Sequence, residues 1–269
     1  MLHLEAQDIS SDSHARLTHF FERLAHAPAR ALILDYDGTL APFSPERHRA
    51  LPYPAVPPLL DRIRDRDDTR LVFVTGRRAY EVAALLGMKH LEVWGCHGFS
   101  RLLPDGTYCS PKLNEEKVRR MARANELLVN EGLFDLLEFK PASTAIHWRG
   151  FEAGANQVAR KVERIWATLP TREGLRLLEF DGGMEIRVEG FDKGDAVRTI
   201  LSEVSRDAAV AYLGDDHTDE DAFAALQGYG LSVRVGKDRR PTVADIWIRP
   251  PEGLIAFLAD WIAIRGGAS

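Results

Sequence analysis

The sequence lacks the features that mark several classes of protein. Only Cys96 and Cys109 are present among 269 residues, too few for a disulfide framework or a cysteine-ligated zinc site. The first thirty residues include Asp8, Asp12 and Glu22 and contain no continuous apolar run of the kind found in a signal peptide. No other run is long enough to span a membrane. We therefore expect a cytoplasmic protein without a membrane partner.

The sequence also has no excess of positively charged residues. The chain has 35 Lys and Arg against 40 Asp and Glu, a formal net charge of -5, which argues against a nucleic-acid partner. Its hydrophobic content of 45% and charged content of 28% are those of an ordinary globular protein. The length fits one large or two modest domains. We expect a monomer.

Apolar, strand-like segments alternate with segments of helical periodicity over most of the chain. The expected strands cover residues 31–34, 70–74, 91–94, 208–213, 231–235 and 246–248, and the expected helices 57–66, 79–86, 196–204, 220–226 and 254–262. Strands and helices that alternate in this way favour a parallel sheet with crossover helices. The order therefore predicts an α/β fold with a doubly wound, mostly parallel, Rossmann-like sheet at its core.

The segment 113–189 interrupts this order and has a different pattern. One helix is expected after Asn114, which can cap it, and a second at 155–169. Hairpin-like pairs of strands stand on each side of the second helix, at 136–140 with 145–149 and at 175–180 with 184–188. We therefore predict a discontinuous core domain, 1–112 and 190–269, that carries a smaller inserted α/β cap domain.

Two motifs follow neighbouring strands of the predicted core. Asp35-Tyr36-Asp37-Gly38-Thr39 puts two carboxylates and a glycine turn at the end of the first strand, where ligands of open α/β sheets bind. Val74-Thr75-Gly76-Arg77 ends the second strand and opens a helix, so the Thr75 hydroxyl and the first backbone N–H groups could hold a phosphate. Taken singly, each motif also fits a solvated turn or a helix cap.

Acidic residues gather again after the expected strand 208–213, in Gly214-Asp215-Asp216-His217-Thr218-Asp219-Glu220. Such acids repel one another without a cation, and oxygen ligands at a strand end suggest magnesium. The alternative is an exposed helix start in which Thr218 and Asp221 form a capping box. Lys193 precedes an expected core helix and fits either a solvated flank or part of the same site.

Together, these four segments resemble the haloacid dehalogenase superfamily of phosphohydrolases, and further motifs resemble its trehalose-6-phosphate phosphatases. The motifs of the closer resemblance are Asp35-Tyr36-Asp37-Gly38-Thr39-Leu40, Thr75-Gly76-Arg77, Cys96-His97-Gly98, Glu138-Phe139-Lys140, His147-Trp148-Arg149, Glu185-Ile186-Arg187, Lys193-Gly194 and Gly214-Asp215-Asp216. The chain departs from the family at Ser100, where Glu is usual, and at Val188, where Pro is frequent. The resemblance implies a haloacid-dehalogenase-type core with a cap that sets substrate specificity.

The resemblance also implies roles for the core residues. Asp35 would attack phosphorus to give an aspartyl phosphate, and Asp37 would protonate the departing sugar hydroxyl and later deprotonate water. Mg²⁺ is the implied cofactor. The implied catalytic residues are Asp35, Asp37, Thr75 and Lys193, and the implied metal ligands are Asp35, Asp37 through its backbone carbonyl, and Asp215. Asp216 and Asp219 either orient these ligands or begin the next helix.

Substrate specificity is expected in the cap. Alternation along its strands places pairs of charged residues on one face, which suits a polyhydroxylated sugar. The same pattern also fits the wet face of a half-buried sheet. The implied substrate-binding residues are Gly76, Arg77, Glu138, Lys140, His147, Arg149, Glu185 and Arg187.

The sequence therefore predicts a magnesium-dependent phosphatase that hydrolyses trehalose 6-phosphate to trehalose and phosphate. Two alternatives stay open. The substrate could be another phosphorylated sugar, such as sucrose phosphate or mannosyl-3-phosphoglycerate, because the core motifs do not indicate which leaving group the enzyme accepts. The protein could also be a catalytically silent sensor of a small-molecule sugar phosphate, although the intact set of Asp35, Asp37, Lys193 and Asp215 argues against this.

Overall fold

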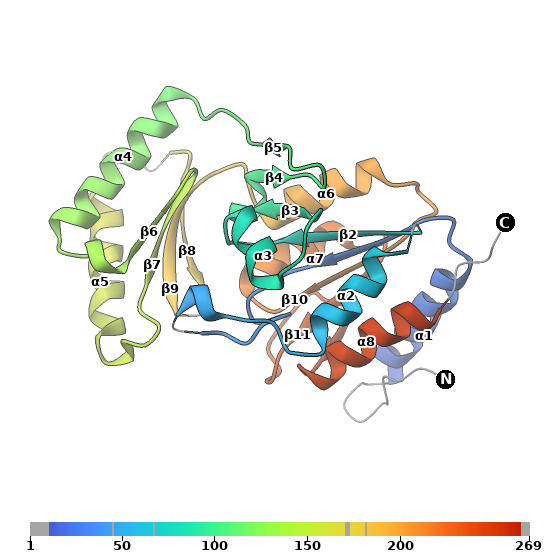
Figure 1. The fold of residues 1–269 in the computed structure, drawn as a ribbon. Coiled ribbons are helices and arrows are strands. Elements are labelled where there is room, and N and C mark those ends of the chain that lie inside the picture. Colours follow the sequence, from blue (N-terminus) through green and yellow to red (C-terminus); the bar gives the residue numbers. More distant parts are fainter. Residues whose placement is uncertain (1–10, 45, 67, 170–172, 181, 265–269) are drawn as a thin grey trace. The chain divides into compact units, whose positions relative to one another are not determined.

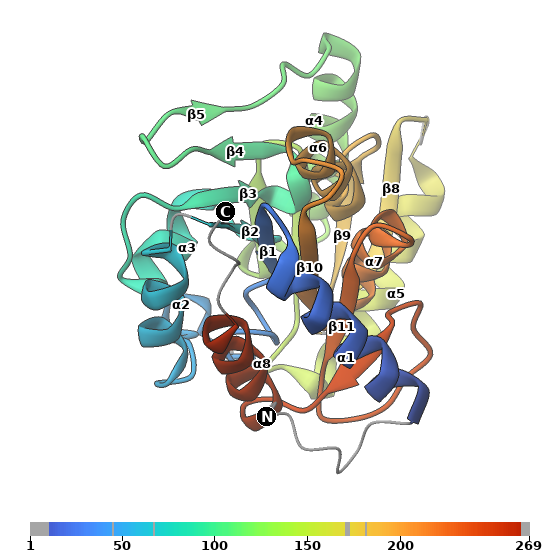
Figure 2. The ribbon, with the colours of Figure 1, turned by 90° about the vertical axis from the view of Figure 1, so that its right-hand side faces the viewer.

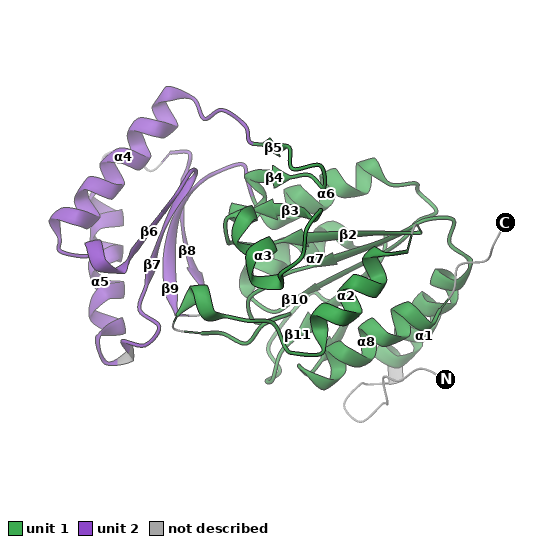
Figure 3. Ribbon diagram, viewed as in Figure 1, with its two compact units in different colours: residues 1–109, 192–269 green, residues 110–191 purple. Residues whose placement is uncertain are grey.

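The computed structural model describes residues 11–44, 46–66, 68–169, 173–180 and 182–264 (Figure 1). The chain forms two compact units (Figure 3). Unit 1 comprises Met1–Cys109 and Asp192–Ser269, and unit 2 comprises Ser110–Phe191. No helix within the described ranges is both long and apolar enough to cross a membrane.

The strands of unit 1 are β1 (Arg30–Leu34), β2 (Thr69–Val74), β3 (Glu92–Gly95), β4 (Ser100–Leu102), β5 (Tyr108–Cys109), β10 (Ala209–Gly214), β11 (Leu231–Val235) and β12 (Ile246–Ile248). In the described part of the chain they form one sheet in the order β12-β11-β10-β1-β2-β3-β4-β5. The strands from β12 to β3 run parallel, and β4 and β5 are antiparallel at one edge. This mostly parallel sheet confirms the predicted fold class.

Helices cover both faces of this sheet because the central strands are apolar on both faces (Figures 1 and 2). The helices of unit 1 are α1 (Ser11–His26), α2 (Val56–Arg64), α3 (Ala79–Leu86), α6 (Lys193–Glu203), α7 (Glu220–Leu226) and α8 (Glu252–Ala263). Leu32 and Leu34 of β1 belong to the core formed with α1, α2, α3 and α8. Ala31 and Ile33 belong to the core formed with α6 and α7. The sheet is therefore doubly wound.

The sequence analysis did not predict α1, β4 and β5. The signal for α1 was present, because Leu17, Phe20, Phe21 and Leu24 recur at helical spacing and are buried. The strands β4 and β5 have three and two residues, too few for an alternating pattern to be recognised. They are strands only because β4 pairs with the edge of β3, and β5 pairs in turn with β4.

Unit 2 contains α4 (Glu115–Asn130), β6 (Leu137–Lys140), β7 (Ser143–His147), α5 (Glu152–Thr168), β8 (Leu175–Phe180) and β9 (Gly183–Val188). As expected, Asn114 caps α4, and its side chain accepts a hydrogen bond from the Lys117 amide at 2.8 Å. In the described part of unit 2 the strands form an antiparallel sheet in the order β6-β7-β9-β8. Thr144 of β7 donates to Asn125 of α4 at 2.7 Å, so one face of this sheet packs against the helices.

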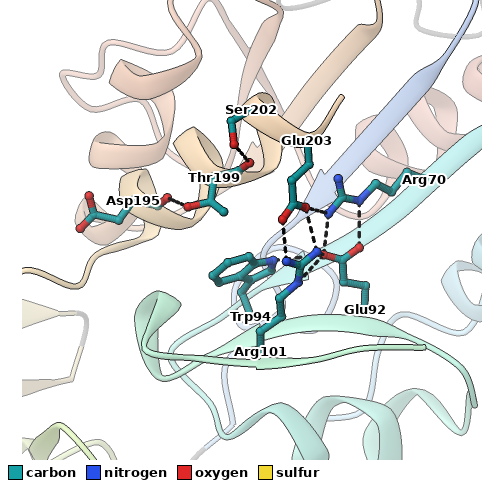
Figure 4. A network of polar contacts seen from close by, with 8 residues as sticks. All are labelled: Arg70, Glu92, Trp94, Arg101, Asp195, Thr199, Ser202 and Glu203. Carbon is teal, nitrogen blue, oxygen red and sulfur yellow. Dashed lines mark hydrogen bonds and ion pairs between the residues drawn. The ribbon is translucent and has the colours of Figure 1, made fainter. Parts of the chain in front are cut away.

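A cluster of ion pairs ties the end of α6 to the unit 1 sheet (Figure 4). Arg70 of β2 and Arg101 of β4 both contact Glu92 of β3 and Glu203 at the end of α6, at 2.6 to 2.8 Å. The Glu92 side chain is 7% exposed and also accepts a hydrogen bond from Trp94 Nε1. Because Lys193 stands at the other end of α6, this cluster helps to fix the helix that carries it.

We expect Glu92→Ala to lower the free energy of unfolding by about 2–4 kcal/mol, because two partly buried guanidinium groups lose a charged hydrogen-bond partner. Urea denaturation followed by tryptophan fluorescence measures this change. The control is Glu126→Ala, which removes an exposed ion pair with Arg123 on α4 and should change stability by no more than about 0.5 kcal/mol. Equal effects of the two substitutions would show that the Glu92 cluster does not stabilise the fold.

Candidate active site

Asp35, the first of the predicted aspartates, follows β1 in a turn that lies close to the acid-rich segment 214–220 after β10, which we call the acidic loop. The Asp35 amide donates to the Leu213 carbonyl of β10 at 2.8 Å, and the residue is 4% exposed. Gly38 has a φ of +79°, and a Cβ there would lie 2.0 Å from Asp215 Oδ2. Glycine is required at this position by both its backbone conformation and its neighbour.

The Lys193 ammonium lies between two buried carboxylates. Its Nζ is 2.9 Å from Asp35 Oδ1 and 2.7 Å from Asp219 Oδ1, and all three side chains are at most 5% exposed. A capping box between Asp192 and Asp195 fixes the first turn of α6, where Lys193 stands. Lys193 is therefore part of the acidic cluster and not a solvated flank.

Asp219 connects the groups of this cluster, a role that the sequence left open. Its Oδ1 accepts hydrogen bonds from Lys193 Nζ at 2.7 Å and from the Tyr212 hydroxyl at 2.5 Å. Its Oδ2 accepts from the backbone amides of Asp215 and Asp216 at 3.1 and 2.9 Å. Four donors occupy the acceptor sites of this carboxylate. No sequence motif indicated Tyr212, because its bond to Asp219 exists only in the folded chain.

The alternative interpretation, a capping box between Thr218 and Asp221 at the helix start, does not describe this turn, because the N-cap residue of α7 is Asp219. The box forms between Asp216 and Asp219, around the 3₁₀ helix η4 (His217–Asp219) that precedes α7. The three-residue spacing is the expected one, but it starts two residues earlier. The chain turns directly after β10, and this turn brings Asp219 back to the amides at the end of the strand.

The buried charges of the cluster do not balance. Among the described residues, Asp35, Asp215 and Asp219 place carboxylate oxygens within 4.8 Å of one another, against the single ammonium of Lys193. Burial raises the pKa of Asp35 to about 7. Burial, together with Asp35 and Asp219, raises the pKa of Asp215 well above its ordinary value. Burial would lower the pKa of Lys193, but Asp219 and Asp35 raise it above its ordinary value. The cluster is short of positive charge.

A divalent cation fits this deficit. Carboxylate oxygens are the ligands that Mg²⁺ prefers, and a cation beside Asp35 and Asp215 would favour their charged forms. Since four donors already occupy Asp219, the carboxylates with remaining acceptor capacity are Asp35, which accepts from Lys193, and Asp215, which accepts from Thr39 at 3.3 Å.

Asp37 is paired with an arginine. Arg77 Nε and Nη2 donate to Asp37 Oδ2 and Oδ1, each at 2.6 Å, in two parallel bonds. Arg77 Nη1 also donates to the Arg47 carbonyl at 2.9 Å, and the guanidinium lies 5.4 Å from the centre of the Tyr36 ring. The Asp37 side chain is 30% exposed and that of Arg77 only 2%. In this structure Arg77 holds Asp37, and its contact with a substrate stays a prediction.

Thr75 and Gly76 form the turn that leads from β2 towards α3. Thr75 Oγ1 accepts a hydrogen bond from the Arg77 amide at 3.1 Å, and a hydroxyl that accepts one bond can still donate another. A Cβ at Gly76 would lie 2.7 Å from Cε1 and Nε2 of His97. His97, which has a φ of 56°, therefore packs against this turn, in line with a structural role.

The polar residues predicted to bind substrate in the cap, with the exception of Arg149, meet on the sheet face opposite α4 and α5. The strand register places Glu138 beside Ala145 and Glu185, and Lys140 beside Ser143 and Arg187. We call this the polar face of unit 2, and it comprises Glu138, Lys140, Ser143, His147, Glu185 and Arg187.

Ion pairs and hydrogen bonds join the side chains of the polar face. Lys140 Nζ lies 3.1 Å from Glu185 Oε1, and the Ser143 hydroxyl donates to the same oxygen at 2.8 Å. His147 Nε2 lies 2.9 Å from Glu138 Oε2. Lys140 and Glu185 are at most 5% exposed, which argues against the alternative of a solvated face.

Two arginines were also predicted to bind substrate in the cap, and only Arg187 belongs to the polar face. Arg187 is 6% exposed, its Nη1 is 3.9 Å from Glu185 Oε2, and this nitrogen has no hydrogen-bond partner among the described residues. Arg149 was expected in the same strand as His147 but lies beyond the end of β7, because the turn after β6 is short and β7 begins at Ser143. Arg149 packs beside Gly182, where a Cβ would lie 2.9 Å from its Nε.

Comparisons with known proteins found relatives of this chain. A family model described as Trehalose-phosphatase matches residues 33–244. A bifunctional trehalose-6-phosphate synthase/phosphatase of Thermoproteus tenax is 30% identical over 236 residues, which cover 87% of this chain and 32% of that protein. A probable trehalose-phosphate phosphatase H of Arabidopsis thaliana is 27% identical over 284 residues, which cover 95% of this chain and 80% of that protein. The chain thus spans about a third of the first relative's length and most of the second's.

A solved structure shares the fold. The C-terminal domain of the trehalose-6-phosphate phosphatase of C. albicans superposes with a TM-score of 0.76 at 18% sequence identity, over 92% of this chain and 97% of that chain. The family match contains Asp35, Lys193 and Asp215 of unit 1 and all of unit 2. The chain belongs to the trehalose-phosphatase family, whose named relatives are phosphoric monoester hydrolases.

Proposed function

We propose that the protein hydrolyses trehalose 6-phosphate to trehalose and phosphate. The observation that carries this proposal is the cluster of Asp35, Lys193 and Asp215 at the carboxyl edge of a parallel sheet, in a chain of the trehalose-phosphatase family. The names of the relatives indicate the substrate of the proposal. The cluster contains groups that are able to transfer a phosphoryl group.

Asp35 is the proposed nucleophile. Its carboxylate forms a bond to phosphorus while the bond from phosphorus to the sugar oxygen breaks, and Asp37 gives its proton to that oxygen. In the second half of the reaction Asp37 takes a proton from water, the water oxygen bonds to phosphorus, and the bond from phosphorus to the Asp35 oxygen breaks, which frees phosphate and restores the Asp35 carboxylate. Arg77, through its two bonds to Asp37, keeps this acid and base in one place during both transfers.

Mg²⁺ is the proposed cofactor, held by Asp35, Asp215 and the backbone carbonyl of Asp37, and it would neutralise the charge of the phosphate that otherwise repels the nucleophile. Lys193 offsets the charge of Asp35, and Thr75 offers a hydroxyl hydrogen to a phosphate oxygen. Asp219 orients Lys193 and the Asp215 loop through its hydrogen bonds.

The polar face of unit 2 is the proposed binding surface for the sugar, and residues 113–189 form the proposed specificity domain. Arg187 supports this proposal because it offers a buried donor next to Glu185. Charged groups of both signs suit the many hydroxyls of a disaccharide, which both donate and accept hydrogen bonds. Gly76, Arg77 and Arg149 remain proposed contacts of the same substrate.

Another phosphorylated sugar stays the second candidate substrate. Ser100 stands in β4 where the family usually has Glu, is 1% exposed, and its Oγ has no hydrogen-bond partner in the described part of the chain. Val188 ends β9 where the family often has Pro. A sensor without activity would have no need of both Asp35 and Asp37, so we do not favour it. The cytoplasmic location and the monomeric state stay predictions.

We expect Asp35→Asn to lower turnover by about a thousandfold or more, because the amide keeps the size of the side chain but is not a nucleophile. Phosphate release from trehalose 6-phosphate measures this loss, and circular dichroism checks the fold. The control is Asp207→Asn, an exposed residue before β10, which should retain full activity. Turnover at the wild-type rate by Asp35→Asn would rule out the proposed nucleophile.

Protons and Mg²⁺ should compete for the same carboxylates. Since burial holds the pKa of Asp35 at about 7, its carboxyl ionises as the pH rises through 7 and takes up a proton as the pH falls. We expect a chelator to abolish phosphate release, Mg²⁺ to restore it, and the half-saturating Mg²⁺ concentration to be roughly tenfold higher at pH 6 than at pH 8. Mg²⁺ titrations at the two pH values test this. Full activity of the metal-free protein would exclude the site, and equal half-saturation would exclude the competition.

We expect Lys140→Ala to lower kcat/KM for trehalose 6-phosphate about ten- to a thousandfold while nitrophenyl phosphate, which has no sugar, is hydrolysed nearly as before. Steady-state kinetics with both substrates measure the difference. The control is Arg176→Ala, which removes an exposed arginine from β8, the strand at the opposite edge of the same sheet. Equal losses with both substrates would mean that Lys140 supports the fold, and no loss would mean that the polar face does not bind the sugar.

A further inference from the structure

A side chain outside the sequence motifs contacts the acidic loop after β10. Arg240 lies in the segment between β11 and β12, and its Nη2 donates to the backbone carbonyls of Asp215 and Asp216 at 3.0 and 2.8 Å. The side chain is 18% exposed. Arg240 therefore binds the backbone of the loop that supplies one of the proposed metal ligands.

Arg240 is itself held in place. Its Nη1 forms an ion pair with Glu220, the first residue of α7, and donates to the Pro241 carbonyl at 2.9 Å. The other carboxylate oxygen of Glu220 accepts from the Thr242 hydroxyl at 3.1 Å and from the Val243 amide at 2.9 Å. Glu220 thus fixes the arginine and the segment after it to the start of α7.

The backbone of Asp215 is consequently held at both of its polar groups. Its amide donates to Asp219 Oδ2 at 3.1 Å, and its carbonyl accepts from Arg240. The same two side chains hold the amide and the carbonyl of Asp216. A rotation of either peptide group would break a charge-assisted hydrogen bond, so the backbone from which the Asp215 carboxylate extends is fixed.

We propose that Arg240 is a positioning residue for the Asp215 carboxylate and thereby for Mg²⁺. The inference rests on the metal site of the proposed function. Arg240 acts through the backbone, since its bonds to residue 215 go to the carbonyl and not to the carboxylate. Groups that orient metal ligands in this way typically change metal affinity 10- to 100-fold when they are removed.

Whether replacing Arg240 weakens or strengthens Mg²⁺ binding distinguishes a positioning role from a purely electrostatic one. A positive charge near a cation site opposes cation binding, so an arginine that acted only by its charge would weaken Mg²⁺ binding, and its removal would strengthen it. An arginine that positions Asp215 has the opposite effect. Its removal lets the carboxylate turn away and weakens Mg²⁺ binding.

Mg²⁺ binding to the full chain without substrate, measured by isothermal titration calorimetry, tests the proposal. We expect Arg240→Gln to raise the Kd for Mg²⁺ about tenfold or more. The matched control is Arg239→Gln, which removes the same charge from the preceding residue, whose guanidinium lies over the Trp247 ring at 4.9 Å. It should change the Kd by no more than about twofold. Arg240→Lys keeps the charge but not the forked geometry, so its Kd should lie between those of wild type and Arg240→Gln.

A second variant covers the case in which Arg240→Gln does not fold, as judged by circular dichroism. Glu220→Asp keeps the charge and Arg240 but shortens the side chain that anchors the arginine, and it should raise the Kd in the same direction by a smaller factor. Unchanged or tighter Mg²⁺ binding by a folded Arg240→Gln, or by Glu220→Asp in its place, overturns the inference. If the wild-type protein binds no Mg²⁺, the proposed site fails and the inference fails with it, whereas phosphate release by wild type tests the proposed activity separately.

Discussion

A buried ammonium shared by two carboxylates is the interaction on which the candidate site depends. Lys193 Nζ contacts Asp35 at 2.9 Å and Asp219 at 2.7 Å, and none of the three groups has appreciable access to water. Without the lysine, buried acids would stand together without a counter-charge, which costs several kcal/mol. The lysine does not satisfy the cluster completely, because Asp215 adds another carboxylate. The remaining negative charge is what makes the site a candidate for a divalent cation.

The parallel sheet brings these groups together. β10, β1 and β2 are neighbours, so the residues that follow them, Asp215, Asp35 and Thr75, emerge at the same edge although they are far apart in the sequence. α6 starts at Lys193, and its far end is fixed by the Glu203 ion pairs. Each participating loop is held by its own polar contacts, Asp37 by Arg77 and the acidic loop by Asp219 and Arg240. The rigidity of the site comes from these contacts.

The sequence analysis predicted the helices and strands that can be recognised from consecutive residues alone. Buried strands read as apolar runs, so β1, β2 and β10 were found near their true bounds, and the acid-rich segments after β1 and β10 followed from their positions at strand ends. Short strands that exist only by pairing, β4 and β5, were missed. The end of β7 was placed two residues too late, at Arg149 instead of His147, because a strand boundary depends on the register with its neighbours.

The sequence by itself determined the fold class, the chemical groups at the strand ends and the resemblance to a phosphatase family, since each of these is written in consecutive residues. Only the tertiary structure decided which groups pair. Three contacts join residues that belong to no common sequence motif. They are the contacts of Tyr212 with Asp219, of Arg77 with Asp37, and of Arg240 with the backbone of Asp215. Such partners depend on the positions of side chains in the folded chain, and periodicity along the chain indicates only the face of a helix or strand on which a side chain lies, not the side chain of another segment that it meets.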